Sequence, residues 1–151
     1  MIYTITLNPA LDYTISLKKI SINEINTSIN EHMLPGGKGI NVSIILKRLG
    51  IESIAIGFIS GFIGEEIKRL VEIENIKTEF IKLKNENSRI NIKILEENNE
   101  TAINCKGPYI ENEYIEKLYQ KLDDLKDDDT LVISGSVPRG INEEIYEKIC
   151  E

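Results

Sequence analysis

Apolar and polar positions alternate along the chain with two different periods, which separate predicted helices from predicted strands. Helical period follows residue 41, begins again at Glu65 and is clearest over 111–126, and Asn142 can cap a last helix. Between these helices, runs of β-branched and apolar residues predict core strands over residues 2–7, 53–59 and 130–134. Strands that alternate with helices indicate an α/β fold with an open, mainly parallel sheet flanked by helices.

Two segments depart from this alternation and predict a small separate β-sheet. Residues 13–31 alternate loosely, and residues 88–105 form a hairpin whose first strand alternates strictly. One face of that strand is apolar, and the other carries Arg89, Asn91 and Lys93. This polar face suits a phosphorylated sugar, because arginine holds phosphate through paired N–H donors. The commoner meaning of such alternation is a solvent-exposed hairpin face, so both interpretations stay open.

Residues 35–41 read Pro-Gly-Gly-Lys-Gly-Ile-Asn and lead directly into a predicted helix. The apolar face of that helix is made by Val42, Ile45, Leu46 and Leu49. Glycines at a helix N-terminus let backbone approach a ligand, and the N–H groups there favour an anion or a hydroxyl. Within the stretch, Lys38 adds a positive charge and Asn41 adds an amide that both donates and accepts.

Neither common nucleotide-binding motif fits this stretch. Gly39 replaces the Ser or Thr of a Walker A loop, and Val42 stands where G-x-G-x-x-G requires its last glycine. Gly57, Gly61 and Gly64 predict a second loop, between a core strand and the helix from Glu65. Alone, the stretch at 35–41 is more typical of an ordinary glycine-rich loop than of a binding site.

Two further candidates follow predicted strands, at the edge where open α/β sheets bind ligands. Asp12 comes just after the first strand and could hydrogen-bond sugar hydroxyls. A turn-forming aspartate after Pro9 is an equally good interpretation. Ser136 lies in a small-residue loop after the strand at 130–134.

Composition mainly excludes classes of function. With 151 residues the chain can bury one core, and its net charge of −7 argues against a nucleic-acid surface. The start does not read as a signal peptide, and no run predicts a membrane span. Cys105 and Cys150 lack metal-ligand spacing, so we expect reduced thiols in a cytoplasmic protein. His32 is the only histidine, which leaves little for a catalytic triad or a zinc site.

Four short motifs stand in a characteristic order and spacing. They are Thr-Leu-Asn-Pro-Ala-Leu-Asp at 6–12, Pro-Gly-Gly-Lys-Gly-Ile-Asn-Val at 35–42, Arg-Ile-Asn-Ile-Lys at 89–93 and Ile-Ser-Gly-Ser-Val-Pro at 133–138. Together they resemble the phosphofructokinase B branch of the ribokinase-like carbohydrate kinases, over the whole chain. The resemblance implies that residues 1–151 are the N-terminal part of a single kinase domain. It also implies that 13–31 and 88–105 form a β-sheet lid, which commonly pairs two subunits into a homodimer.

Within that branch the chain is most similar to kinases that use ATP and Mg²⁺ to phosphorylate fructose 1-phosphate to fructose 1,6-bisphosphate. Kinases of tagatose 6-phosphate are the alternative, and the basic residue at Lys93 favours the former. The substrate-binding residues that the resemblance implies are Asp12, Gly36, Gly37, Lys38, Asn41, Arg89, Lys93 and Ser136. Asp12, Asn41 and the glycine backbone would hold sugar hydroxyls, and Arg89 would hold the substrate's phosphate. Lys38 and Lys93 are weaker candidates for the phosphate.

The resemblance also implies parts that this chain lacks. The catalytic aspartate of these kinases lies in a Gly-Ala-Gly-Asp motif in their C-terminal half, together with the nucleotide pocket and the motif tied to Mg²⁺. No Gly-x-Gly-Asp occurs in these 151 residues. We therefore expect the C-terminal half to be missing and the chain alone to be inactive as a kinase. A non-catalytic module for sugar-phosphate binding or dimerisation, and an unstable truncation product, are the alternatives.

Overall fold

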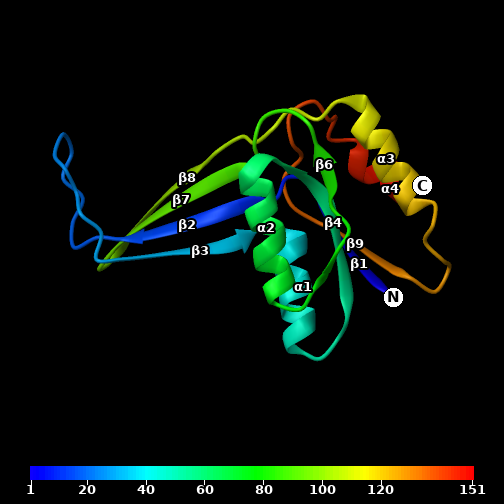
Figure 1. Cartoon of the computed structure of the whole chain (residues 1–151), viewed down its shortest axis with the longest axis horizontal. Coiled ribbons are helices and arrows are strands. Elements are labelled where there is room, and N and C mark those ends of the chain that lie inside the picture. The colour runs from blue at the N-terminus through cyan, green and yellow to red at the C-terminus, as the bar shows by residue number, and fades with distance from the viewer.

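The computed structural model describes residues 1–151 as a helix-flanked core sheet from which a second sheet projects (Figure 1). The core strands run in the order β5-β4-β1-β9, with β6 also beside β4, and every pairing is parallel. These strands are β1 (Ile2–Thr6), β4 (Ser53–Ser60), β5 (Lys77–Thr78), β6 (Ile81–Leu83) and β9 (Thr130–Ile133). The three core strands predicted from the sequence are thus confirmed to within one residue at each end.

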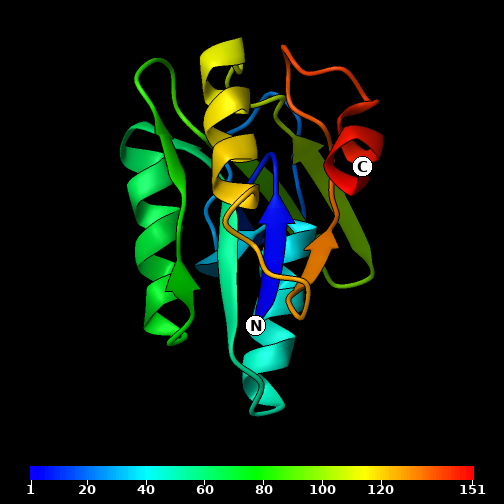
Figure 2. The ribbon, with the colours of Figure 1, turned by 90° about the vertical axis from the view of Figure 1, so that its right-hand side faces the viewer.

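Helices cover both faces of the core sheet (Figure 2). The four helices are α1 (Lys38–Arg48), α2 (Gly61–Ile73), α3 (Asn112–Leu122) and α4 (Ile145–Cys150). Alternate residues of β4 belong to two separate apolar clusters: Ile54 and Ile56 pack with residues of α3 and α4, whereas Ala55 packs with residues of α1 and α2. None of the four has the length and apolar content that a membrane crossing requires.

The second sheet, called the lid from here on, has the strand order β3-β2-β7-β8. Its strands are β2 (Ala10–Ser16), β3 (Asn30–Gly36), β7 (Arg89–Glu96) and β8 (Asn99–Asn104). The predicted small sheet is present, but it is longer than predicted. Pro35 and Gly36, which the sequence placed in a loop, end β3 and pair with Leu11 and Ala10 of β2.

The predicted loop at Gly57, Gly61 and Gly64 is wrong. Gly57 lies inside β4, and α2 already begins at Gly61 rather than at Glu65. A Cβ on Gly57 would stand 2.0 Å from the backbone oxygen of Thr6 in the neighbouring strand. Glycine there permits the close approach of β1 and β4. The residue at position 57 is therefore explained by close packing between two strands, and not by a turn.

The apolar face of α1 does not face the core. The buried residues of this helix are Gly39, Ile40 and Ser43, whereas Ile45 is 53% exposed and Leu49 is 70% exposed. Polar bonds hold the buried side: the Ser43 hydroxyl lies 2.7 Å from Thr4 Oγ1 and 2.9 Å from Ser53 Oγ. The apolar pattern therefore predicted the helix correctly, but the apolar residues lie on its outer side and not on the side that packs on the core.

Two helix ends also differ from the prediction. The helix expected over 111–126 ends at Leu122, and the last helix begins at Ile145 instead of near Asn142. The Asn142 side chain accepts a hydrogen bond from the Glu144 N–H at 3.1 Å, just ahead of the helix. It thus supports the turn that leads into α4, rather than capping the helix itself.

Candidate functional site

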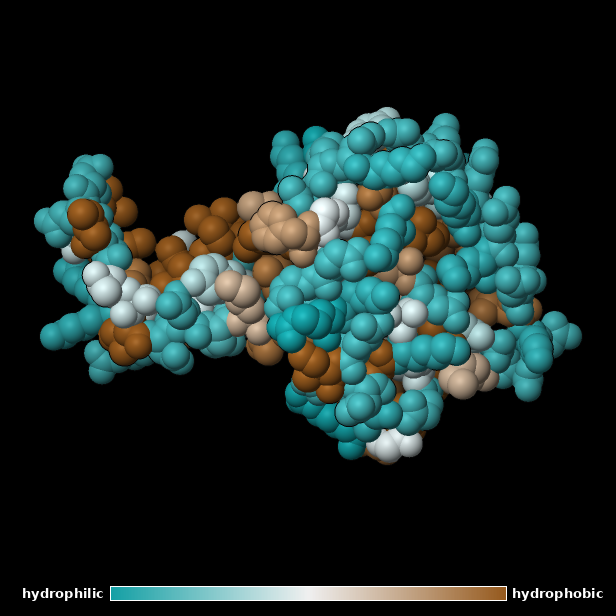
Figure 3. Space-filling view, viewed as in Figure 1, coloured by the Kyte–Doolittle hydropathy of each residue, from teal (hydrophilic) through white to brown (hydrophobic).

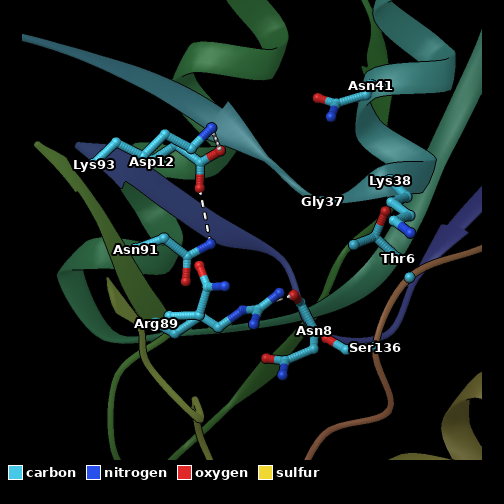
Figure 4. A pocket seen from close by; sticks show the side chains of 12 residues that line it. Thr6, Asn8, Asp12, Gly37, Lys38, Asn41, Arg89, Asn91, Lys93 and Ser136 are labelled. Atoms are coloured by element: carbon cyan, nitrogen blue, oxygen red, sulfur yellow. Dashed lines mark hydrogen bonds and ion pairs between the residues drawn. The ribbon is translucent and has the colours of Figure 1, made fainter. Parts of the chain in front are cut away.

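A cavity of about 470 Å³ lies where the lid meets the core sheet (Figure 4). None of its lining residues is hydrophobic. They are Thr6, Asn8, Asp12, Gly37, Lys38, Asn41, Arg89, Asn91, Lys93, Asn104, Gly135 and Ser136. The wall combines the carboxyl end of β1, the lid strands β2, β7 and β8, the start of α1 and the loop after β9.

Seven of the eight residues proposed from the sequence line this cavity. The eighth, Gly36, does not line it, but a Cβ at that position would stand 2.6 Å from Asp12 Oδ1. Glycine at position 36 therefore makes room for the Asp12 carboxylate. Residues that are 124 positions apart in the sequence, Asp12 and Ser136, share one cavity.

Asp12 is held in place by its neighbours on β7. Asp12 pairs with Asn91 in the register of β2 and β7, and the Asn91 amide donates to Asp12 Oδ1 at 2.9 Å. Lys93 Nζ lies 3.6 Å from Asp12 Oδ2. The carboxylate thus has a fixed orientation, with lone pairs left to accept from further donors.

Arg89 is anchored to the backbone at the base of the lid. Its Nε donates to the Asn8 carbonyl at 3.1 Å, and its Nη1 donates to the Cys105 carbonyl at 3.4 Å. Burial lowers the pKa of the half-buried Arg89 guanidinium from its ordinary value, against the opposing charge of Asp12. Such a guanidinium stays protonated at neutral pH and keeps further N–H donors for a ligand.

The start of α1 forms the opposite wall. Gly37 has a φ of 121°, and a Cβ there would stand 2.4 Å from Thr6 Cγ2. The Gly37 position offers no side-chain cap, but Thr6 Oγ1 accepts the Ile40 N–H at 2.9 Å. The N-terminal turn of α1 therefore faces the cavity with the positive end of its dipole and with the exposed Lys38.

Sequence reasoning missed five of the residues that line the cavity. They are Thr6, Asn8, Asn91, Asn104 and Gly135. The sequence placed Asn91 on the polar face of β7 with Arg89 and Lys93, but did not include it among the substrate-binding residues. Asn104 lies at the cavity because it pairs with Asn91 across β7 and β8. The sequence alone does not reveal this register.

The cavity differs in charge from the rest of the molecule. Lys38, Arg89 and Lys93 bring three positive charges to it, and Asp12 brings the single negative charge. The chain as a whole carries a net charge of −7. A concave site of opposite sign to its surroundings concentrates ligands of complementary charge, here anions.

Comparison with known proteins decides the family. Residues 5–151 match the model of the pfkB family of carbohydrate kinases. The chain belongs to that family. It is 45% identical over 149 residues to the 1-phosphofructokinase of Borreliella burgdorferi, covering 99% of this chain and 48% of that protein. It is also 39% identical over 150 residues to a tagatose-6-phosphate kinase of Staphylococcus epidermidis, covering 99% of this chain and 48% of that protein.

The architecture agrees with this relationship. The crystal structure of phosphofructokinase-2 from Escherichia coli in complex with fructose 6-phosphate superposes with a TM-score of 0.91 at 27% identity. The superposition covers 99% of this chain and 50% of that protein. The expected ribokinase-like fold is confirmed, and the chain spans about half the length of the curated relatives it matches.

The residues of this cavity do not fit the Mg²⁺ and ATP that carbohydrate kinases use. Nowhere do three or more His, Cys, Asp or Glu side chains gather to hold a metal ion. The one carboxylate of the cavity, Asp12, is already paired with Asn91 and Lys93. The cavity also has no apolar wall against which an adenine ring could pack.

Proposed function

We propose that this chain carries the sugar-phosphate-binding part of a 1-phosphofructokinase, with fructose 1-phosphate as its ligand. The observation that supports this most is the wholly polar cavity with three cations and one carboxylate. A phosphorylated sugar has the matching chemistry, because it joins one dianionic group to several hydroxyls. The relationship to a 1-phosphofructokinase at 45% identity favours fructose 1-phosphate over tagatose 6-phosphate as the ligand.

Each side chain has a role in this proposal that follows from its chemistry. Asp12 accepts hydrogen bonds from sugar hydroxyls, and Asn41 together with the backbone of Gly37 completes the hydroxyl site. Arg89 grips the phosphate with its remaining N–H donors, assisted by Lys38. Lys93 acts mainly on Asp12, given the 3.6 Å between their charged atoms. Ser136 closes the cavity from the loop after β9.

In the whole enzyme, we propose, residues 1–151 form the N-terminal part of one domain. The general base and the sites for ATP and Mg²⁺ then belong to a second half, and the reaction takes place in the cytoplasm. Phosphoryl transfer depends on placing the acceptor hydroxyl in line with the nucleotide, so the contribution of this chain is to hold and orient the acceptor. The chain alone is therefore expected to bind fructose 1-phosphate without phosphorylating it.

The lid supplies a second proposed role, the pairing of two copies. The face of the lid turned away from the cavity carries Tyr13, Ile15, Met33, Ile92, Ile94 and Ile103. Met33 is 46% exposed and Ile103 is 51% exposed. Figure 3 shows hydrophobic residues along this projecting part of the molecule. Burial of that face against the lid of a second copy would remove it from water, so we propose a homodimer formed through the lid.

Calorimetric titration of the chain with fructose 1-phosphate tests the ligand. We expect saturable binding that Arg89→Ala weakens strongly and that Lys18→Ala, on an exposed part of the lid, leaves unchanged. Binding that is indifferent to Arg89→Ala, or tighter for tagatose 6-phosphate, would overturn the assignment. For the lid, sedimentation should give a dimer that Ile103→Glu converts to monomer. A monomeric parent chain would contradict that second role.

A further inference from the structure

The loop after β9 carries two lining residues of the cavity, but its backbone makes few contacts of its own. The last bond of the sheet ladder, from the Ser134 N–H to the Ile5 carbonyl, is long at 3.4 Å. Beyond it, residues 135–138 make no hydrogen bond to any other backbone group of the chain. Gly135 and Ser136, which form part of the cavity wall (Figure 4), are therefore not oriented by the sheet.

A single side chain holds this loop from behind. The Tyr146 hydroxyl, on α4, donates to the Gly135 carbonyl at 2.7 Å. This is the one hydrogen bond in the chain that reaches the backbone of residues 135–138. Figure 2 shows α4 (red) beside the loop that rises from β9 (orange). Tyr146 does not line the cavity, so it acts on the wall without facing the ligand space.

The ring of Tyr146 is a firm support for that hydroxyl. It packs against the apolar cluster that contains Ile110, Leu118 and the neighbouring Ile145, which is 4% exposed. Burial raises the pKa of the Tyr146 phenol above its ordinary value, and no charged neighbour contributes to the shift. The hydroxyl therefore stays protonated at neutral pH and keeps the proton that it donates to Gly135.

The bond to Tyr146 also fixes the direction of an N–H group. The peptide that joins Gly135 to Ser136 is trans, so its C=O and its N–H point in opposite directions. Because the Gly135 carbonyl points toward Tyr146, the Ser136 N–H points away from α4. That N–H has no acceptor within the chain. It is therefore a free donor in a residue that lines the cavity.

Glycine at position 135 brings this donor close to the start of α1. Its φ of 116° lies in the left-handed region that favours glycine. A Cβ there would lie 3.9 Å from the Lys38 backbone nitrogen, so the loop passes beside the first turn of α1. The free N–H groups and the positive dipole end of that turn favour an anion. The Ser136 N–H adds one more donor on the same side of the cavity.

We propose that Tyr146 is a positioning residue of the ligand site. By holding the Gly135 carbonyl, it directs the Ser136 N–H toward an anionic oxygen of the bound sugar phosphate. The inference rests on the proposed function for the identity of the ligand, and it adds a residue that lies outside the cavity wall. A tyrosine that only anchored α4 would contribute to stability and leave the affinity for the ligand unchanged.

The test is Tyr146→Phe in the complete 151-residue chain, which removes the hydroxyl and keeps the ring. In the parent chain, titration with fructose 1-phosphate should move the NMR signal of the Ser136 amide proton downfield, as donation to an anion does. In Tyr146→Phe this shift should be much smaller. Calorimetry should show binding about three- to tenfold weaker, the factor that corresponds to one neutral hydrogen bond.

The matched control is Tyr119→Phe, on α3. Tyr119 packs against the same apolar cluster, but its hydroxyl, unlike that of Tyr146, makes no hydrogen bond within the chain. The control should bind fructose 1-phosphate like the parent and give the same shift at Ser136. The proposal would be overturned by parent-like binding of Tyr146→Phe, by an unchanged Ser136 shift in that variant, or by an equal loss of affinity in the control.

NMR relaxation without ligand separates this proposal from the ligand assignment. Tyr146→Phe should lower the order parameter of the Ser136 N–H, because the loop loses its one hydrogen bond, and Tyr119→Phe should not. An unchanged order parameter would overturn the role of Tyr146 even if fructose 1-phosphate binds to the parent. A lowered order parameter in a chain that does not bind fructose 1-phosphate would support the orientation of the loop by Tyr146 and overturn the ligand assignment instead.

Discussion

Asn91 donates its side-chain amide to Asp12 Oδ1 at 2.9 Å, across two strands that are 79 residues apart in sequence. The two residues are register partners in the parallel pairing of β7 with β2. On their other sides, β2 pairs with β3 and β7 pairs with β8, and both of these pairings are antiparallel. Asn91 Oδ1 is buried and has no hydrogen-bond partner of its own. The amide is therefore oriented by Asp12, and the carboxylate by the amide.

Asn91→Asp should convert this support into repulsion. Two adjacent carboxylates disfavour double ionisation, so the pKa of one of them rises. As the pH falls, that carboxylate takes up a proton earlier than an isolated one would. We expect fructose 1-phosphate to bind about tenfold more weakly at pH 8, since a lost bond to a charged group costs about 1.5–3 kcal/mol. Part of the loss should be recovered near pH 5. Asn98→Asp, in the exposed turn of the hairpin, controls for the added charge, and affinity relative to this control is the quantity to measure.

Arg89→Lys keeps the charge in the cavity and removes the fork of donors. Arg89 uses two nitrogens on the carbonyls of Asn8 and Cys105, and an ammonium group cannot reproduce that geometry while it also holds a phosphate. We expect calorimetry to show binding at least about tenfold weaker, because 1.4 kcal/mol corresponds to a factor of ten. If charge alone were sufficient, the lysine variant would bind like the parent.

Gly57→Ala should destabilise the core sheet. A Cβ at this position would stand 2.0 Å from the Thr6 oxygen, and backbone of a buried strand cannot easily yield. Overpacking of this kind costs about 1–3 kcal/mol, and we expect a loss of more than about 2 kcal/mol in urea unfolding. Gly50→Ala is the control, because its Cβ would meet nothing within 4 Å and only its φ of 78° opposes the change. A smaller effect at Gly57 than at Gly50 would contradict the steric explanation.

The sequence was a good guide to the local elements and to the polar residues at strand ends. The family resemblance implied Asp12, Arg89 and Ser136 as site residues, and all three line the cavity. The alternation of β7 correctly separated its polar face from its apolar face. The separation of the two faces of β7 needed only the period of the strand.

Features that depend on partners distant in sequence were not predictable. Gly57 was mistaken for a turn residue because its crowding comes from Thr6, 51 positions earlier. The apolar side chains of α1 from Val42 to Leu49 have the period of a core-facing helix, yet Ser43 and its hydroxyl contacts occupy the buried side. Asn104 reaches the cavity only through its cross-strand register with Asn91. In each case the decisive contact is made by another segment.

Arg139 joins three loops around the cavity from the outside. Its Nη2 lies 2.6 Å from Glu86 Oε2, and its Nε and Nη2 both donate to the Gly107 carbonyl, at 3.0 and 2.7 Å. Glu86 has a φ of 63° without being glycine, and Gly107 has a φ of 84°. Arg139 therefore ties two connections between core and lid to the loop that carries Ser136.

Arg139→Gln should loosen these loops while leaving overall stability nearly unchanged. The side chains of Arg139 and Glu86 are 47% and 46% exposed, and exposed ion pairs contribute about 0–1 kcal/mol. We expect faster amide exchange over 105–109 and 136–140, and binding of fructose 1-phosphate weakened by a few-fold. Lys82→Gln is the control, since it removes an equally short exposed ion pair with Glu65, at 2.6 Å, away from these loops. Equal exchange in the two variants would mean that the loops keep their positions without Arg139. A difference confined to the Arg139 variant would show that the cavity is shaped in part by contacts outside its wall.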